Sequence, residues 1–183
     1  MYRSLSPAVF LVDGYNIIGA WSCLKKTRDN SGLEAARYEL VELLTSFCAF
    51  QGYDAHLVFD AQYQNTSGNK EVITEHLSVH YTDFGQTADT FIEKLCADLR
   101  QQLALAVISR VIVATSDRAQ QLMVQGYGAE YISAQQLNSR IEASIHQTKL
   151  KSKSKKQPQG RFLANSIDAK ARDRLAELRM GSK

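Results

Sequence analysis

Three aspartates, Asp13, Asp60 and Asp117, each stand at or just beyond the end of a short apolar run. If these runs are parallel strands of one sheet, the three carboxylates lie at the same edge, where ligands bind in open α/β sheets. A single aspartate after a strand is more often a turn residue or a helix cap than a ligand. The repeated pattern therefore leaves two interpretations open, a shared site and three separate caps.

Asp89 is expected to join them from the first turn of a helix that Thr87 caps. Carboxylates packed together raise one another's pKa unless a cation neutralises them. Oxygen ligands without His or Cys suit a hard ion such as Mg²⁺ or Mn²⁺. Such an ion supports in-line hydrolysis of a phosphodiester, so the set predicts a nuclease. Glu93, one turn further along the helix, is either a solvated residue or a further contact to the metal.

The elements that would position these residues alternate between strands and helices. Apolar runs predict strands at residues 8–12, 55–59, 77–81, 111–114 and 131–132. Amphipathic patterns predict helices at residues 31–51, 87–105, 118–125 and 133–148. In the first helix, Ser31 and Glu34 form a capping-box pattern and Gly52 is the stop; Ser133 is the expected cap of the last. The alternation predicts an α/β domain with a central, mainly parallel sheet of four or five strands and helices on both faces.

Charge divides the chain into an acidic body and a basic tail. Residues 1–148 contain 11 Lys and Arg against 16 Asp and Glu, whereas residues 149–183 contain 11 against 3. We expect a folded domain over 1–148 and a basic C-terminal extension over 149–183, with a lysine-rich linker to residue 160 and a short helix over 166–179. The asymmetry predicts a polyanionic partner, although a solubilising tail would have the same composition.

Other classes of protein are disfavoured. The three cysteines are widely spaced and form no C-x-x-C pair, which argues against a disulfide framework or a zinc site and for a reduced, cytoplasmic location. No apolar run approaches the length of a membrane span. Gly14 and Gly19 have the wrong spacing for a dinucleotide-binding loop. The four histidines have no mutual spacing that indicates a site, and Tyr15 and Trp21 are either base-stacking or packing residues.

Four motifs in order carry a resemblance to a known family. They are Val12-Asp-Gly-Tyr-Asn-Ile-Ile-Gly19, Val58-Phe-Asp-Ala61, Gly85-Gln-Thr-Ala-Asp-Thr-Phe-Ile-Glu93 and Val113-Ala-Thr-Ser-Asp-Arg118. Together they resemble the YacP-like NYN-domain family of PIN-fold endoribonucleases over about residues 8–148. The resemblance implies a PIN-like sheet and a divalent-metal site in which Asp13, Asp89 and Asp117 hold the ion. It also matches Asn16 to the Asn that shapes the site and Asp60 to the acidic end of the second strand.

Members of this family resemble ribosome-associated nucleases that cut mRNA in the ribosomal A site, a context that suits a basic extension. The sequence departs from the family pattern at two places. Gln86 stands where many relatives have an acidic residue, and Arg118-Ala119-Gln120 adds no carboxylate after Asp117. If those acids help to bind a second ion, this protein holds one, or holds the second weakly; cleavage with a single metal is still compatible with the chemistry.

The first hypothesis is therefore a metal-dependent endoribonuclease acting on single-stranded RNA. Asp60 and Glu93 would assist through water or outer contacts, and Asn16 and Ser116 would orient ligands or phosphate. The basic residues expected to contact RNA phosphates are Lys151, Lys153, Lys155, Lys156, Arg161, Arg172 and Arg174. The alternative is a non-catalytic RNA- or ribosome-binding module on the same scaffold. A DNA nuclease would use the same chemistry, so the preference for RNA, and for mRNA in particular, rests on the resemblance.

Overall fold

A six-stranded sheet forms the centre of the computed structural model, which describes residues 7–60 and 68–155. Its strands are β1 (Ala8–Asp13), β2 (Tyr53–Phe59), β3 (Asn69–Thr74), β4 (Leu77–Tyr81), β5 (Arg110–Ala114) and β6 (Glu130–Ile132). The order across the sheet is β3-β4-β2-β1-β5-β6, and within the described part of the chain the pairings are parallel except that of β3 with β4. This arrangement confirms the predicted α/β class.

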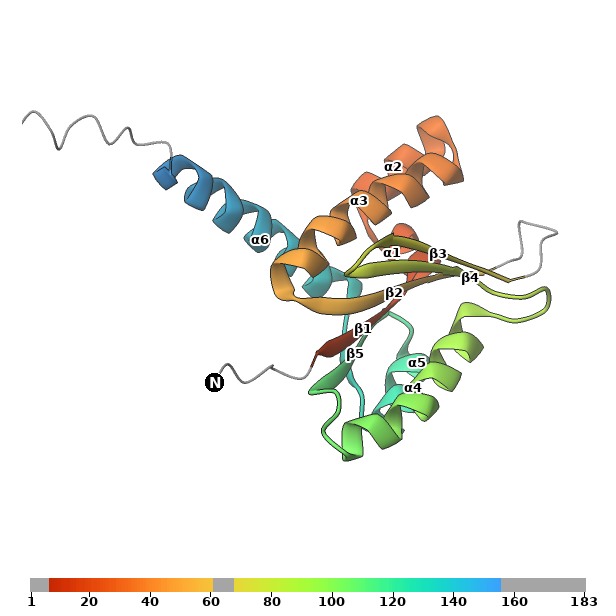
Figure 1. Cartoon of the computed structure of the whole chain (residues 1–183). Helices are drawn as coiled ribbons and strands as arrows, with labels where there is room; N and C mark the ends of the chain where they lie inside the picture. Colours follow the sequence, from red (N-terminus) through yellow and green to blue (C-terminus); the bar gives the residue numbers. More distant parts are fainter. Residues whose placement is uncertain (1–6, 61–67, 156–183) are drawn as a thin grey trace, which may run out of the picture. The chain divides into compact units, whose positions relative to one another are not determined.

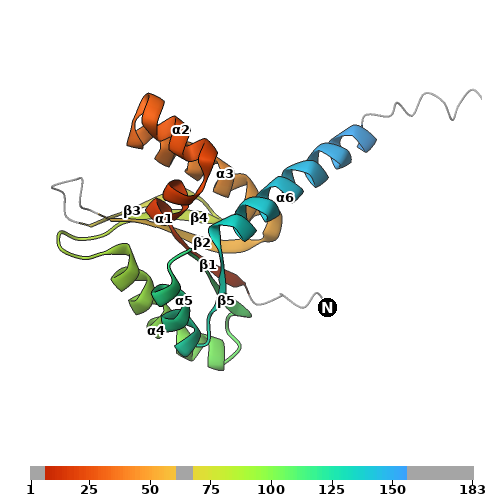
Figure 2. The same cartoon turned by 180° about the vertical axis from the view of Figure 1, so that it is seen from behind.

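Helices cover both faces of the sheet (Figures 1 and 2). They are α1 (Gly14–Ala20), α2 (Ser22–Ser31), α3 (Leu33–Gln51), α4 (Ala88–Ala104), α5 (Arg118–Gly126) and α6 (Ala134–Lys155). Two separate cores result, because alternate residues of each strand point to opposite faces. Phe10, Leu57 and Leu44 belong to the core under α1–α3 and the start of α6, whereas Leu11 and Ile92 belong to the core under α4 and α5.

The entry to α3 differs from the prediction. Ser31 is the last residue of α2, so its backbone is already helical and cannot take the extended conformation of an N-cap. Gly32 is the N-cap instead, at φ 90°, and the cap has no side-chain hydrogen bond. The predicted pairing of Ser31 with Glu34 is therefore wrong. The predicted stop is confirmed, because Gly52 is left-handed at φ 68°.

Three elements were not expected from the sequence: α1, α2 and the edge strand β3, which makes the sheet larger than the predicted four or five strands. Ser133 caps α6 as predicted. The backbone N–H of Gln136 donates to Ser133 Oγ at 3.2 Å, and Gln136 Oε1 accepts from the Ser133 N–H at 2.9 Å. None of the described helices is both long enough and apolar enough to cross a membrane.

The chain divides into two compact units, residues 1–145 and 146–183. In the second unit the description covers residues 146–155, which are helical, so α6 runs beyond its expected end near residue 148. The remainder of the predicted linker and the predicted helix over 166–179 lie outside the described residues.

Candidate active site

Asp13 is the last residue of β1 and also the cap of α1. Its Oδ1 accepts a hydrogen bond from the backbone N–H of Asn16 at 3.0 Å, and the residue is only 8% exposed. Burial is the largest of the effects that raise the pKa of the Asp13 carboxyl to about 6, and that hydrogen bond opposes it. The charges of Asp89, Asp60 and Asp117 contribute to the same rise. A buried carboxylate among like charges is a group that a cation would stabilise.

Asp117 and Asp60 also bind the first turns of helices. Asp117 Oδ1 accepts from the N–H groups of Ala119 (2.7 Å) and Gln120 (3.0 Å) at the start of α5. Asp60 Oδ1 accepts from the N–H of Ala88, the first residue of α4. The strand-end aspartates are therefore contacts of helix starts, and the shared site stays a prediction. Each carboxylate caps or steadies a helix through Oδ1, and each lies in the same acidic cluster.

Asp89 completes the cluster from the first turn of α4. Thr87 caps this helix as predicted, its Oγ1 accepting from the N–H of Thr90 at 3.2 Å. Burial raises the pKa of Asp89, and the charges of Asp117 and Asp60 raise it further. Asp13, Asp60, Asp89 and Asp117 are thus near enough to repel one another, as the topology of the predicted sheet required.

Asn16 and Ser116 tie the elements around the cluster together. Asn16 donates its backbone N–H to Asp13 and accepts the N–H of Ser116 on its side-chain Oδ1 at 2.7 Å. Ser116 Oγ in turn accepts from the N–H of Ala134 at 3.1 Å. These contacts connect the end of β1, the loop after β5 and the start of α6. The two side chains thus join backbone segments next to Asp13 and Asp117.

Other predicted contacts lie elsewhere. Glu93 Oε1 accepts a hydrogen bond from the Tyr127 hydroxyl at 3.1 Å, between α4 and the end of α5. Of the predicted RNA-binding residues, Lys151, Lys153 and Lys155 are on the last turns of α6. The others, Lys156, Arg161, Arg172 and Arg174, lie outside the described residues.

The chemistry of the donor set fits a hard divalent cation, because four carboxylates crowd together without a neutralising group among their hydrogen-bond partners in the described residues. The present side-chain positions do not form a ligand group: within residues 7–60 and 68–155, no three His, Cys, Asp or Glu side chains are placed to hold a metal ion.

Two features near this edge were not expected from the sequence. Phe84, in the loop between β4 and α4, leaves 85% of its surface exposed. His56 on β2 and His80 on β4 lie with Nδ1 and Nε2 2.9 Å apart, and burial lowers the pKa of His80 to about 4. Trp21, a possible base-stacking residue, is instead a core residue whose Nε1–H donates to the Ala134 carbonyl at 2.7 Å.

Comparison with known proteins shows the family and agrees with the fold. The sequence model of the YacP-like NYN domain matches residues 10–180, a range that continues through the basic segment. The uncharacterised protein YacP of Bacillus subtilis (strain 168) is 36% identical over 140 residues, 73% of this chain and 75% of the relative. A crystal structure of a mutant of Rae1 (YacP) from B. subtilis is similar with a TM-score of 0.65 and 32% identity, covering 82% of this chain and 84% of that one. A second Rae1 (YacP) crystal structure has a TM-score of 0.61 and 28% identity, covering 94% and 95%.

Proposed function

The chain belongs to the YacP-like NYN domain family, a class of PIN-like nuclease domains, and from this premise we propose that it is a divalent-metal-dependent endoribonuclease. The observation that carries the proposal is the convergence of four carboxylates at the carboxyl edge of the sheet, which contributes to raising the pKa of Asp13 to about 6. PIN-like nucleases typically use divalent metals, and this oxygen-only cluster is the matching donor set.

In the proposed mechanism, Asp13, Asp89 and Asp117 hold Mg²⁺ or Mn²⁺. When bound, the cation lowers the pKa of a water molecule and stabilises the negative charge that develops on the phosphoryl oxygens. Asp60 keeps the start of α4, and with it Asp89, against the end of β2 through its contact with Ala88. Asn16 and Ser116 hold the backbone from which Asp13 and Asp117 project. Glu93, whose Oε1 accepts a hydrogen bond from the Tyr127 hydroxyl, would assist through water or an outer contact.

The proposed substrate is single-stranded RNA, and the proposed context is mRNA on the ribosome in the cytoplasm. Family membership supports the nuclease class, while the choice of RNA follows the resemblance of the motifs. The basic segment after residue 148 would supply contacts to phosphates outside the crevice.

A non-catalytic RNA- or ribosome-binding module is the second candidate. The observation in its favour is that the described carboxylates are not already arranged as a metal-ligand group. Such a module would bind RNA with an affinity that falls with salt but would leave the strand intact.

The experiment is cleavage of a fluorescent single-stranded RNA with Mn²⁺ or Mg²⁺, on free RNA and on translating ribosomes, with single-stranded DNA of the same sequence alongside. The variants are Asp13→Asn and Asp89→Asn, and the matched control is Asp98→Asn, an exposed carboxylate further along α4. We expect each cluster variant to lower kcat/KM by roughly a hundredfold or more, since even outer-shell contacts to a metal contribute 10–100-fold. Asp98→Asn should match the wild type.

Cleavage that persists undiminished in both cluster variants would refute the metal-site assignment. RNA bound but left intact by the wild type, both free and on ribosomes, would establish the binding module instead. Equal cleavage of the DNA strand would show a nuclease without selection for the 2′-hydroxyl.

A further inference from the structure

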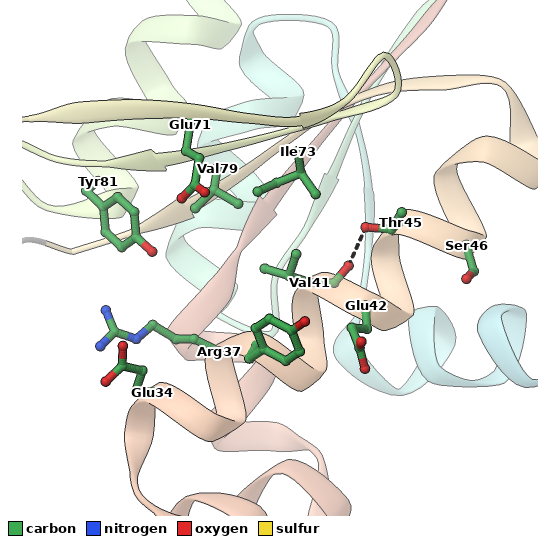
Figure 3. Close-up of a pocket in the computed structure, with 11 residues that line it drawn as sticks. Glu34, Arg37, Val41, Glu42, Thr45, Ser46, Glu71, Ile73, Val79 and Tyr81 are labelled. Carbon is green, nitrogen blue, oxygen red and sulfur yellow. Dashed lines mark hydrogen bonds between the residues drawn. The ribbon is translucent and has the colours of Figure 1, made fainter.

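A cavity of about 600 Å³ lies between α3 and strands β3 and β4 (Figure 3), on the face of the sheet opposite α4. Side chains enter it from both sides: Arg37 and Val41 from α3, and Glu71, Val79 and Tyr81 from the two strands. Its volume is in the range of small-molecule sites, which bury most of a ligand's surface. The cavity is therefore large enough for a nucleobase and its sugar.

One end of the cavity is aromatic and cationic. Tyr81 stacks on Phe59 with ring centroids 5.8 Å apart, and the Arg37 guanidinium lies 6.0 Å from the centroids of both rings. The Nε–H of Arg37 is buried and donates to no group among the described residues. The cavity favours a ligand that accepts a hydrogen bond at this end, because the Arg37 guanidinium that lines it carries N–H donors and no acceptor.

The other charged groups that line the cavity are acceptors. Glu34, Glu42 and Glu71 outnumber Arg37, so the lining has a net charge of −2. This charge disfavours phosphate as the occupant. It favours a neutral ring whose amino and imino groups donate to a carboxylate, as exposed bases of single-stranded RNA do on their Watson–Crick edges.

The Tyr81 end of the cavity lies toward the sheet edge that carries the acidic cluster. Tyr81 ends β4 at the same sheet edge as Phe59, which is followed directly by Asp60. Phe59 also contacts Tyr15, at 5.0 Å between ring centroids, one residue beyond Gly14 and two beyond Asp13. A base at the Tyr81 end of the cavity would therefore lie on the side of the cavity that faces this sheet edge.

We propose that this cavity is a base-recognition pocket that selects guanine over uracil in the RNA strand, an inference that rests on the proposed endoribonuclease function. Guanine can form hydrogen bonds at both ends of the cavity. Its N1–H and N2–H₂ donate to a carboxylate such as Glu71, and its O6 and N7 accept from an arginine such as Arg37. Uracil presents one donor and lacks the purine acceptors, so it leaves part of the lining unpaired.

The test uses the full chain without metal and two matched probes, 5′-GMP and 5′-UMP, which differ in the base and share the phosphate. Backbone amide shifts of Val41, Ile73 and Val79 report on the pocket, and that of Asp117 reports on the crevice. We expect GMP to shift the pocket residues and to bind about tenfold more tightly than UMP, as one good base contact allows. Glu71→Gln should remove this preference, and Arg37→Lys, which keeps the charge but not the guanidinium plane, should reduce it.

Glu75→Gln is the matched control, because it removes the same charge from the β3–β4 turn, where the side chain is 88% exposed. The preference for GMP should survive it. Equal binding of GMP and UMP by the wild type, or a GMP preference that Glu71→Gln and Arg37→Lys leave unchanged, would overturn the proposal. Pocket shifts caused by N-acetyl-arginine amide but not by GMP would also overturn it and would assign the cavity to a basic peptide.

Nucleotide binding and RNA cleavage are measured in separate experiments, so each can fail without the other. If the wild type prefers GMP at the pocket but cuts neither free nor ribosome-bound RNA, the nuclease function fails and the base pocket stands. If RNA is cut and Asp13→Asn abolishes cutting while GMP has no preference over UMP, the pocket fails and the nuclease function stands.

Discussion

Asp13 combines two roles that affect stability in opposite directions. As the cap of α1 it satisfies a backbone N–H, which stabilises the helix start. As a buried carboxylate beside three others it destabilises the folded state whenever it is ionised. Such a residue is retained at a cost in stability when the charge has a use, and binding a cation is the use that the cluster suggests.

The first prediction concerns pH in metal-free buffer. The pKa of Asp13 rises from 3.8 in the unfolded chain to about 6 in the folded one, so between these values the folded state binds the extra proton. The stability that this proton binding adds to the folded state is fully present below pH 3.8 and is lost as pH rises through 6. Asp13→Asn keeps an acceptor for the Asn16 N–H and removes the charge. It should raise the free energy of unfolding at pH 7.5 by up to about 3 kcal/mol and change it little near pH 4.

Urea unfolding at the two pH values with EDTA measures this effect. Asp98→Asn, which removes an exposed carboxylate of α4, is again the control. A lower stability of Asp13→Asn at pH 7.5 would show that the carboxylate acts as a cap alone. In a separate measurement, adding Mn²⁺ should stabilise the wild type but not Asp13→Asn, because only a folded protein that keeps its metal ligands gains the free energy of binding.

The second prediction concerns Phe84, whose 85% exposed ring stands in the loop that leads from β4 to Asp89. Asp83 Oδ1 accepts from the Gly68 N–H at 2.7 Å and the Gln86 N–H donates to the Asp83 carbonyl at 2.9 Å, so this loop is held in place. An aromatic ring there can stack on a base. Phe84→Ala should weaken binding of single-stranded RNA roughly five- to tenfold, measured by fluorescence anisotropy.

Leu105→Ala is the control for Phe84→Ala. Leu105 follows the last residue of α4, at the opposite end of that helix from Asp89, and is 68% exposed. Its truncation should leave RNA binding unchanged. The same affinity in both variants would mean that the Phe84 ring does not meet the strand.

At the scale of elements, β1 passes directly into α1 at the sheet edge. Gly14 begins α1 immediately after Asp13, and a Cβ added there would overlap the ring of Phe59. Gly19, near the end of the same helix, has no atom within 4 Å of an added Cβ. The two glycines therefore offer a matched pair within one element.

We predict opposite effects for the two substitutions. Gly14→Ala should lower the free energy of unfolding by about 1–3 kcal/mol, because the ring is part of the core and must shift. It should also reduce cleavage, since Asp13 and Asp60 flank the displaced segments. Gly19→Ala should raise stability by roughly 0.5–1 kcal/mol, the helix preference for Ala over Gly, and leave cleavage unchanged. Thermal and urea unfolding measure both; equal stabilities would contradict the close approach of Gly14 to Phe59.

The elements predicted from the sequence are those whose pattern is local. A sequence shows apolar runs and an amphipathic helix face without any knowledge of which elements pack together, as for β1, β2, β4, β5 and α4. The order of these elements places the aspartates at one edge of the sheet. The edge strand β3 is mostly exposed and polar, so its pairing with β4 has no signal in apolar periodicity. Helices α1 and α2 are short and are separated by Trp21. The indole N–H of Trp21 donates to the carbonyl of Ala134, a residue far away in the chain, so this contact has no local signal in the sequence.

The site shows the same division between local and non-local information. Strand ends identified Asp13, Asp60 and Asp117, because parallel strands share a direction. The contact between His56 and His80 depends on β2 and β4 being neighbours, with the β3 strand inserted between them in sequence. The pocket between α3 and β3 depends on an element that the sequence did not reveal. Neither the histidine contact nor the pocket can be inferred from the spacing of residues along the chain.

At the scale of the whole molecule, the acidic body and the basic tail have separate tasks in the proposed function. The body would hold a cation in the crevice, while the positive charges after residue 148 would bind phosphates outside it. If so, the tail governs affinity and its salt dependence, and the cluster governs the chemical step. Substitutions in the two regions should then change different kinetic constants.

The last prediction separates these constants. Replacing Lys156, Arg161, Arg172 and Arg174 together with Gln in the full chain should raise KM for RNA at low salt and leave kcat within about twofold. The slope of log affinity against log salt should become shallower by about 0.7 for each phosphate of a single strand that the tail no longer neutralises. Lys25→Gln with Lys26→Gln, two exposed lysines on α2, is the control and should leave the slope unchanged. An unchanged slope in the tail variant would assign the tail to solubility and would leave the crevice as the source of RNA affinity. A tail that neutralised phosphates could not lose four positive charges without changing the number of counterions released on binding.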